Sequence, residues 1–184
     1  MKRSTFAKWT ALILVTLAGL LLLLVLIGVI RFYSIPTSSM APTIQPGDRI
    51  IGIRITKPAD QLPRGSLIIY DPSQVSPRLS GAFLSRMVAL PGDTIEATSD
   101  GLQVNGQIFP TRSGLLPQPA KDSGSSFTIS VKYPLVVPPG HVFVIGDNYA
   151  NSLDSRYLGP VPVDAVKKQP WIRTAPGSRF GKIE

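Results

Sequence analysis

The chain has 184 residues, with 19 Lys and Arg against 11 Asp and Glu, which gives a formal net charge of +8 at pH 7. This length allows one domain with a small insertion. The basic residues are scattered singly and form no recognisable nucleic-acid-binding motif, so the positive charge does not indicate a nucleic-acid-binding protein. The chain contains no cysteine, which excludes thiol chemistry and suits an exported domain.

A membrane-length apolar segment lies near the N-terminus. Residues 11–30 carry no charge, and Thr16 is their one polar side chain. As a helix, this segment spans about 30 Å, the hydrocarbon thickness of a bilayer. A cleaved secretory signal has a shorter apolar core and a small-x-small cleavage site, whereas this segment is followed by Arg31-Phe32-Tyr33. We therefore predict a retained transmembrane helix over residues 10–31.

The charges flanking the span predict its orientation. Lys2, Arg3 and Lys8 precede it, which favours a short cytoplasmic N-terminus over residues 1–9 and an extracytoplasmic body over residues 32–184. Lys and Arg still outnumber Asp and Glu in that body, and this excess suits contact with anionic lipid headgroups. Membrane lipids are therefore expected partners, and nucleic acid is not.

The chain beyond the span has the pattern of a β protein. All 18 prolines lie from Pro36 onward, a density that disfavours long helices. Residues 49–55 alternate between faces, and Asn105-Gly106 between two short apolar runs is a hairpin signal. Further short strands are expected at residues 66–70, 83–90, 94–98, 102–104, 107–109, 127–131 and 141–145. The predicted fold is mostly β: one N-terminal transmembrane helix and a compact antiparallel β-sheet domain, with an inserted hairpin and loop within residues 94–135.

Three separated blocks carry the candidate chemistry. The first contains Ser39-Met40-Ala41-Pro42-Thr43 followed by Gly47-Asp48, and the second is the run RMVALPGD at residues 86–93. The third covers residues 146–162 and contains GDN, NSLDSR and GPVP in that order. In their order, spacing and placement after one N-terminal span, these blocks resemble the bacterial type I signal peptidases. These are membrane-bound serine proteases that remove signal peptides from exported preproteins.

The resemblance implies a role for each matching residue. Ser39 would be the nucleophile, and its backbone N–H together with the Thr37 hydroxyl would form the oxyanion hole. Ser152 would orient the catalytic amine. Arg86, Asp154 and Arg156 match charged residues of the structural framework. The positions around the family's substrate pockets, which accept small side chains, are matched by Tyr33, Ile35, Phe83 and Leu84.

The chain departs from the family at the general base. In the family a lysine directly precedes the arginine of the second block, and here Ser85 occupies that position. A buried lysine serves as a base because burial lowers its pKa, whereas a serine hydroxyl is far too weak a base. Arg86 cannot replace the lysine, since its guanidinium stays protonated.

Several explanations of this departure stay open. A base can come from elsewhere, with His141, Lys57 and Lys132 as candidates, although all three have the pattern of structural or surface residues. Alternatively, the protein is a catalytically inactive relative that binds preproteins or assists assembly, or Ser85 is an introduced change that disables the enzyme. A specialised pilin-processing peptidase is a further alternative.

The residues imply no cofactor and no metal, because the chain has neither a Cys/His cluster nor a Gly-rich phosphate loop. The resemblance places the protein in the bacterial plasma membrane, with exported preproteins as substrates. The expected activity is that of a serine endopeptidase, which cleaves signal peptides at the outer face of the plasma membrane. We expect Ser85 to impair this activity.

Overall fold

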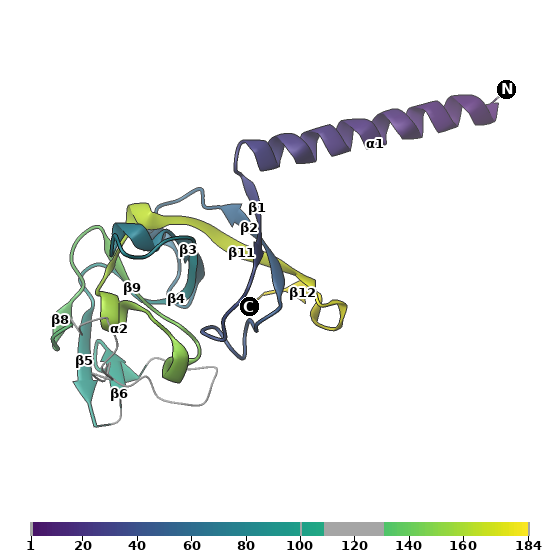
Figure 1. The fold of residues 1–184 in the computed structure, drawn as a ribbon. Coiled ribbons are helices and arrows are strands. Elements are labelled where there is room, and N and C mark those ends of the chain that lie inside the picture. The colour runs from purple at the N-terminus through teal and green to yellow at the C-terminus, as the bar shows by residue number, and fades with distance from the viewer. Residues whose placement is uncertain (1, 100, 109–130, 184) are drawn as a thin grey trace.

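A long apolar helix projects from a β body (Figure 1). The computed structural model describes residues 2–99, 101–108 and 131–183. Helix α1 (Lys2–Leu26) contains the stretch Phe6–Leu26, which is long and apolar enough to cross a membrane and is not buried against the body. The predicted mostly β fold with one N-terminal apolar helix is confirmed.

Helix α1 ends earlier than residue 31, the predicted end of the span, and begins earlier than residue 10. Its C-terminus is closed by Gly28, whose φ of 71° is a left-handed conformation suited to glycine. The Gly28 N–H donates to the Val25 carbonyl over 3.0 Å, and the Val29 N–H donates to the Leu24 carbonyl over 2.9 Å. Since this glycine cap stops the helix, Ile30 and Arg31 enter the first strand instead.

Among the described residues, eight strands form the main antiparallel sheet. Their order is β1-β2-β11-β3-β4-β9-β10, with β12 paired to β11. The strands are β1 (Ile30–Ser34), β2 (Arg49–Arg54), β3 (Leu67–Tyr70), β4 (Phe83–Ala89), β9 (His141–Ile145), β10 (Val161–Pro162), β11 (Val166–Ala175) and β12 (Gly181–Lys182).

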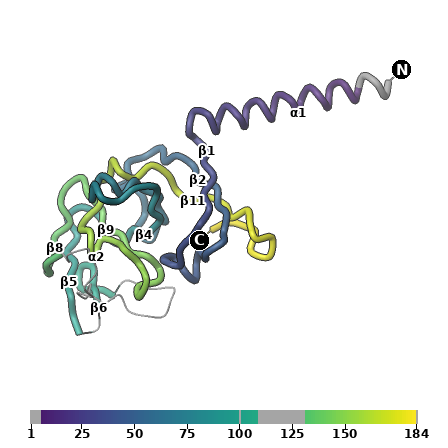
Figure 2. Tube along the Cα trace, viewed as in Figure 1, coloured from purple at the N-terminus to yellow at the C-terminus, as the bar shows by residue number. Residues whose placement is uncertain are grey.

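A second, smaller sheet lies at the end of the body away from α1 (Figure 2). Its order is β7-β6-β5-β8. Its strands are β5 (Thr94–Thr98), β6 (Gly101–Val104), β7 (Gln107–Ile108) and β8 (Leu135–Val136). The expected Asn105-Gly106 turn joins β6 to β7 with positive φ at both residues. Residues 109–130, which include nearly all of the predicted strand at 127–131 and much of the predicted insertion at 94–135, lie outside the described residues.

The remaining regular structure is short. One helix, α2, covers Ser155–Leu158. Single 3₁₀ turns occur at Ala59–Gln61, Pro72–Gln74, Tyr149–Asn151, Val163–Ala165 and Gly177–Arg179.

An apolar core cluster fixes the segment that carries Ser39. Met40 and Ile44, from the turn after Ser39, are 1% and 0% exposed. They pack with Ile50, Leu67, Ile69 and Ile183, and with the half-buried Tyr33, Ile35 and Leu84. Burial of these two side chains therefore anchors the first block to strands β2 and β3.

Candidate active site

One cleft brings the predicted site residues together. It has a volume of about 1240 Å³ and opens between strand β1, the Ser39 turn, strand β4 and the loop after β9. Its lining includes all eight residues expected at the chemistry or in the substrate pockets: Tyr33, Ile35, Thr37, Ser39, Phe83, Leu84, Ser85 and Ser152. Arg86, Asp154 and Arg156 are buried and do not line the cleft.

Hydrogen bonds from the third block hold the Ser39 turn. The Asn148 backbone N–H donates to the Ser39 carbonyl over 2.9 Å, and its side-chain amide donates to the Ser38 carbonyl over 3.1 Å. Asn151 donates to the Ser38 hydroxyl over 2.8 Å. At the exposed side of the turn, the Thr37 and Ser39 hydroxyl oxygens lie 3.2 Å apart. Sequence reasoning assigned no role to Asn148 or Asn151, although both lie in the third block.

Gly146 is the point of closest approach between the first and third blocks. A Cβ atom at this position would lie 2.6 Å from the Ser39 carbonyl oxygen and 2.2 Å from the Ser152 hydroxyl oxygen. Such distances are far below van der Waals contact, so only glycine fits. Ser39 and Ser152 are therefore both packed against the backbone at Gly146.

Asp147 joins all three blocks. Its carboxylate accepts hydrogen bonds from Arg86 Nε over 2.7 Å and from Arg86 Nη2 over 2.8 Å. It also accepts one from the Thr43 hydroxyl over 2.5 Å. The carboxylate is 3% exposed and the arginine 8% exposed, so this bidentate pair is shielded from water. The one sequence feature that could have pointed to Asp147 is its place directly after Gly146 in the third block. The sequence did not show which residues form hydrogen bonds with it.

We expect Asp147→Ala to destabilise the protein by about 3–5 kcal/mol, because it leaves the Arg86 guanidinium buried without a counter-charge. Thermal unfolding of the full chain in detergent, followed by near-UV circular dichroism, measures this change. Asp164→Ala, which removes an exposed carboxylate, is the matched control and should shift the transition little. Equal transitions for the two variants would contradict the assigned role of Asp147.

A second buried ion pair shapes the loop that carries Ser152. Asp154 accepts hydrogen bonds from the Gly146 N–H over 3.0 Å and from Arg156 Nε over 2.8 Å. Arg156 also donates to the Tyr149 carbonyl over 2.9 Å. Burial alone would lower the pKa of Arg156, but its hydrogen bonds and charge interaction with Asp154 raise it. The pair thus holds Gly146 and the loop over residues 149–152 in one arrangement.

Comparison with known proteins identifies the family. The family model described as signal peptidase, peptidase S26, matches residues 6–170. The chain belongs to this family. It is 32% identical over 151 residues to a probable signal peptidase I-2 of Synechocystis sp., which covers 81% of this chain and 65% of that relative. It is 33% identical over 162 residues to signal peptidase I U of Bacillus subtilis, which covers 84% of this chain and 83% of that relative.

Structural comparison finds a signal peptidase I from Enterococcus faecalis. It matches with a TM-score of 0.43 and 27% identity, over 59% of this chain and 96% of that one.

The position expected to hold the base in this signal peptidase family member is occupied by a buried serine. Ser85 is 2% exposed, lies in β4 opposite Ile68 of β3, and lines the cleft. Beside it, burial raises the pKa of Tyr70, and the Ser85 hydroxyl opposes this shift. The Tyr70 hydroxyl makes no hydrogen bond of acceptable geometry within the described part of the chain. Residue 85 is therefore buried beside the Tyr70 hydroxyl at the wall of the cleft.

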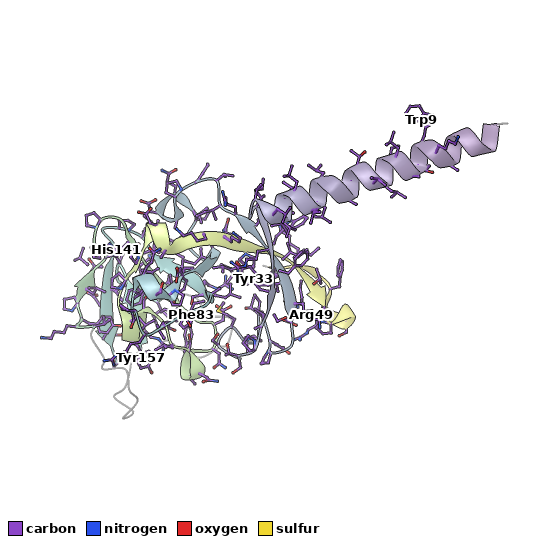
Figure 3. The ribbon with its side chains drawn as sticks, turned by 45° about the horizontal axis from the view of Figure 1, so that its top comes forward. Trp9, Tyr33, Arg49, Phe83, His141 and Tyr157 are labelled. Atoms are coloured by element: carbon purple, nitrogen blue, oxygen red, sulfur yellow. The ribbon has the colours of Figure 1, made fainter. Side chains whose placement is uncertain are left out.

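The other candidate bases lie away from the cleft. Among the described residues, the cleft lining contains no lysine, histidine or carboxylate, and Arg31 is its one permanent charge. His141 lies at the start of β9, with Nδ1 3.0 Å from the Pro139 carbonyl oxygen, and is well separated from Tyr33 (Figure 3). Lys57 and Lys132 are exposed. The described residues also include no cluster of three or more His, Cys, Asp or Glu side chains suited to a metal ion.

Proposed function

We propose that this protein is a membrane-anchored serine endopeptidase of the signal peptidase type, with cleavage impaired by Ser85. One observation carries this proposal: Ser39, Thr37, Ser152 and Ser85 line one cleft, and the described lining includes no amine, imidazole or carboxylate. The site has a nucleophile and its framework without a proton acceptor. The proposed location is the bacterial plasma membrane, with the cleft on its outer face.

The chemistry proposed for the cleft begins with attack by the Ser39 hydroxyl on the carbonyl before the scissile bond. The Ser39 N–H and the Thr37 hydroxyl are donors for the negative charge that develops on this carbonyl oxygen. The C–N bond breaks as the acyl-enzyme forms, and the Ser39 proton reaches the departing amine through water. A second water then hydrolyses the acyl-enzyme ester and returns a proton to Ser39. A general base normally accelerates such proton transfers by about 10²–10⁴-fold. Neither Ser85 nor Ser152 supplies this function.

The cleft also fits the proposed substrate, the cleavage region of an exported preprotein. Tyr33, Ile35, Phe83 and Leu84 give one part of it an apolar lining, which suits small apolar side chains. Strand β1 follows α1 directly and lines the cleft. The anchor therefore holds the cleft near the point where a substrate's own apolar helix leaves the bilayer, and this raises the effective concentration of the substrate.

We expect the unaltered protein to bind a signal-peptide-bearing preprotein and to cleave it slowly, and Ser39→Ala to bind equally well without cleavage. The two proteins are compared in detergent by binding of a labelled preprotein and by product formation over hours. Ser178→Ala, which removes an exposed hydroxyl outside the cleft lining, is the control for loss of a serine and should bind and cleave as the unaltered protein does.

Two outcomes would change the proposal. Fast cleavage by the unaltered protein, lost in Ser39→Ala, would show that a base reaches the site from elsewhere. Binding with no cleavage by either protein would favour the second candidate, an inactive relative that binds preproteins. The lack of a base among the described lining residues is the observation that supports this alternative.

A further inference from the structure

Three basic side chains come from three neighbouring strands near the end of α1. Arg31 lies on β1, Arg54 on β2 and Lys168 on β11, and these strands are adjacent in the order β1-β2-β11. Lys168 is directly opposite Arg54 in the antiparallel pairing of β11 with β2. Arg31 is opposite Gly52, two residues before Arg54. The three positions form one row across the sheet, which we call the basic row.

The basic row lies on the cleft side of the sheet. A Cβ atom at Gly52 would meet the Tyr33 ring at 2.8 Å and the Ile69 side chain at 3.0 Å, which shows the face toward which residue 52 points. Residues two apart on a strand share a face, so Arg54 points to the same side. Lys168 is opposite both Arg54 and Ile69. Arg31 lines the cleft, with its guanidinium 5.8 Å from the centre of the Tyr33 ring.

The basic row has no counter-charge within the part of the chain that the structure describes. The ion pairs there involve Arg64, Arg86, Arg156, Arg173 and Arg179, and none includes a member of the row. Lys168 is only 8% exposed. Burial first, and then the charges of Arg54 and Arg31, lower the pKa of Lys168. Like charges directly opposite in a sheet repel one another, so a bound anion would lower the electrostatic energy of the row.

The row is placed at the level where α1 ends. Arg54 Nη2 donates to the Ile27 carbonyl over 3.2 Å, and the Arg54 N–H donates to the Val29 carbonyl over 2.8 Å. Arg54 therefore caps the last turn of the helix that fits a membrane span. With α1 spanning a bilayer, side chains attached at that level would lie in the layer of lipid headgroups.

From this geometry we propose that Arg31, Arg54 and Lys168 bind the phosphate group of an anionic membrane lipid. Two guanidinium groups and an amine, carried by three adjacent strands, supply donors for phosphate oxygens. The lipid neutralises the repulsion within the row and fixes the height and tilt of the cleft above the bilayer. The proposal depends on the anchoring helix and not on whether Ser39 is active.

Acylation of Lys168 tests the proposal directly. The full chain in neutral detergent is treated briefly with acetic anhydride, and labelling of each lysine is read by peptide mass spectrometry. A bound phosphate group covers the Lys168 amine and favours its protonated form. We expect phosphatidylglycerol to slow Lys168 labelling about fivefold, as one lipid charge contact would produce. Lys182, which is exposed on β12, is the internal control and should be labelled at an unchanged rate.

The comparison arms separate the lipid from other sources of phosphate. Phosphatidylcholine and inorganic phosphate, at the same concentrations, should leave Lys168 labelling unchanged. Arg31→Gln should abolish the effect of phosphatidylglycerol, and Arg49→Gln, an exposed arginine at the other end of β2 (Figure 3), should preserve it. Equal protection by phosphatidylcholine or inorganic phosphate, no protection by phosphatidylglycerol, or protection retained in Arg31→Gln would each overturn the proposal.

Discussion

The Ser85→Lys variant should cleave a preprotein about 10²–10⁴-fold faster than the unaltered protein, the range that a positioned general base contributes. Residue 85 is 2% exposed and lines the cleft that contains Ser39 and Ser152. Burial at this position would lower the pKa of the introduced amine, so that its neutral form is available as a proton acceptor. The measurement is product formation from a signal-peptide-bearing preprotein in detergent, under single-turnover conditions.

The pH profile distinguishes a base from a packing effect. Only the neutral amine accepts the Ser39 proton, so the activity of Ser85→Lys should rise with pH through the lowered pKa of the introduced lysine and then level off. Ser85→Met places a side chain of comparable length there without an amine, and is the matched control for overpacking. The double variant Ser39→Ala/Ser85→Lys should be inactive. A folded Ser85→Lys protein that is no faster than Ser85→Met would show that the site lacks more than its base.

The Gly146→Ala variant should lower both the stability of the fold and the rate of cleavage, although it adds only one methyl group. The added methyl group would lie 2.2 Å from the Ser152 hydroxyl oxygen and 2.6 Å from the Ser39 carbonyl oxygen. The Ser152 hydroxyl can rotate away, but the Ser152 Cβ atom and the Ser39 carbonyl oxygen would both lie 2.6 Å from the new methyl group, so the backbone itself has to move. We expect a loss of about 1–3 kcal/mol in the free energy of unfolding from overpacking.

The effect of Gly146→Ala on catalysis is best measured in the Ser85→Lys background. A displacement of Ser39 by about 1 Å is expected to cost about 100-fold in the rate of cleavage. Gly177→Ala is the matched control, because a Cβ atom there meets nothing within 4 Å. Should Gly146→Ala unfold and cleave as Gly177→Ala does, the close approach at Gly146 would have no bearing on the site.

Local sequence patterns predicted much of this architecture. The apolar run at residues 11–30 predicted the helix, because a membrane span depends on length and composition alone. Alternation at residues 49–55 predicted strand β2, and Asn105-Gly106 predicted a turn. The limits of the helix were less predictable. Its C-terminus depends on one glycine, Gly28, inside an otherwise apolar stretch that hydropathy does not distinguish from helix.

The candidate site was predicted only as a set of matching residues. The blocks named Ser39, Ser85 and Ser152, and the structure brings these three to one cleft. The sequence did not show that Asp147 joins the three blocks. It also did not show that Ser39 and Ser152 both pack directly against the backbone at Gly146. The contacts of Asp147 with Thr43 and Arg86, and of Gly146 with Ser39, join residues about 60 to 110 positions apart in the chain. No local periodicity encodes such pairings, because they follow from the order of strands in the sheet.

Sequence alone determined the anchor, the β character of the body, the family resemblance and the serine at the position of the base. Those properties depend on composition and on short motifs, which are complete within a few residues of the chain. Only the tertiary structure decided that His141, Lys57 and Lys132 stay outside the cleft, and that Lys168 is buried opposite Arg54. Strand register sets the second result, because it fixes which side chains share a face of the sheet. The first follows from where the tertiary structure places β9 and the loops that carry Lys57 and Lys132.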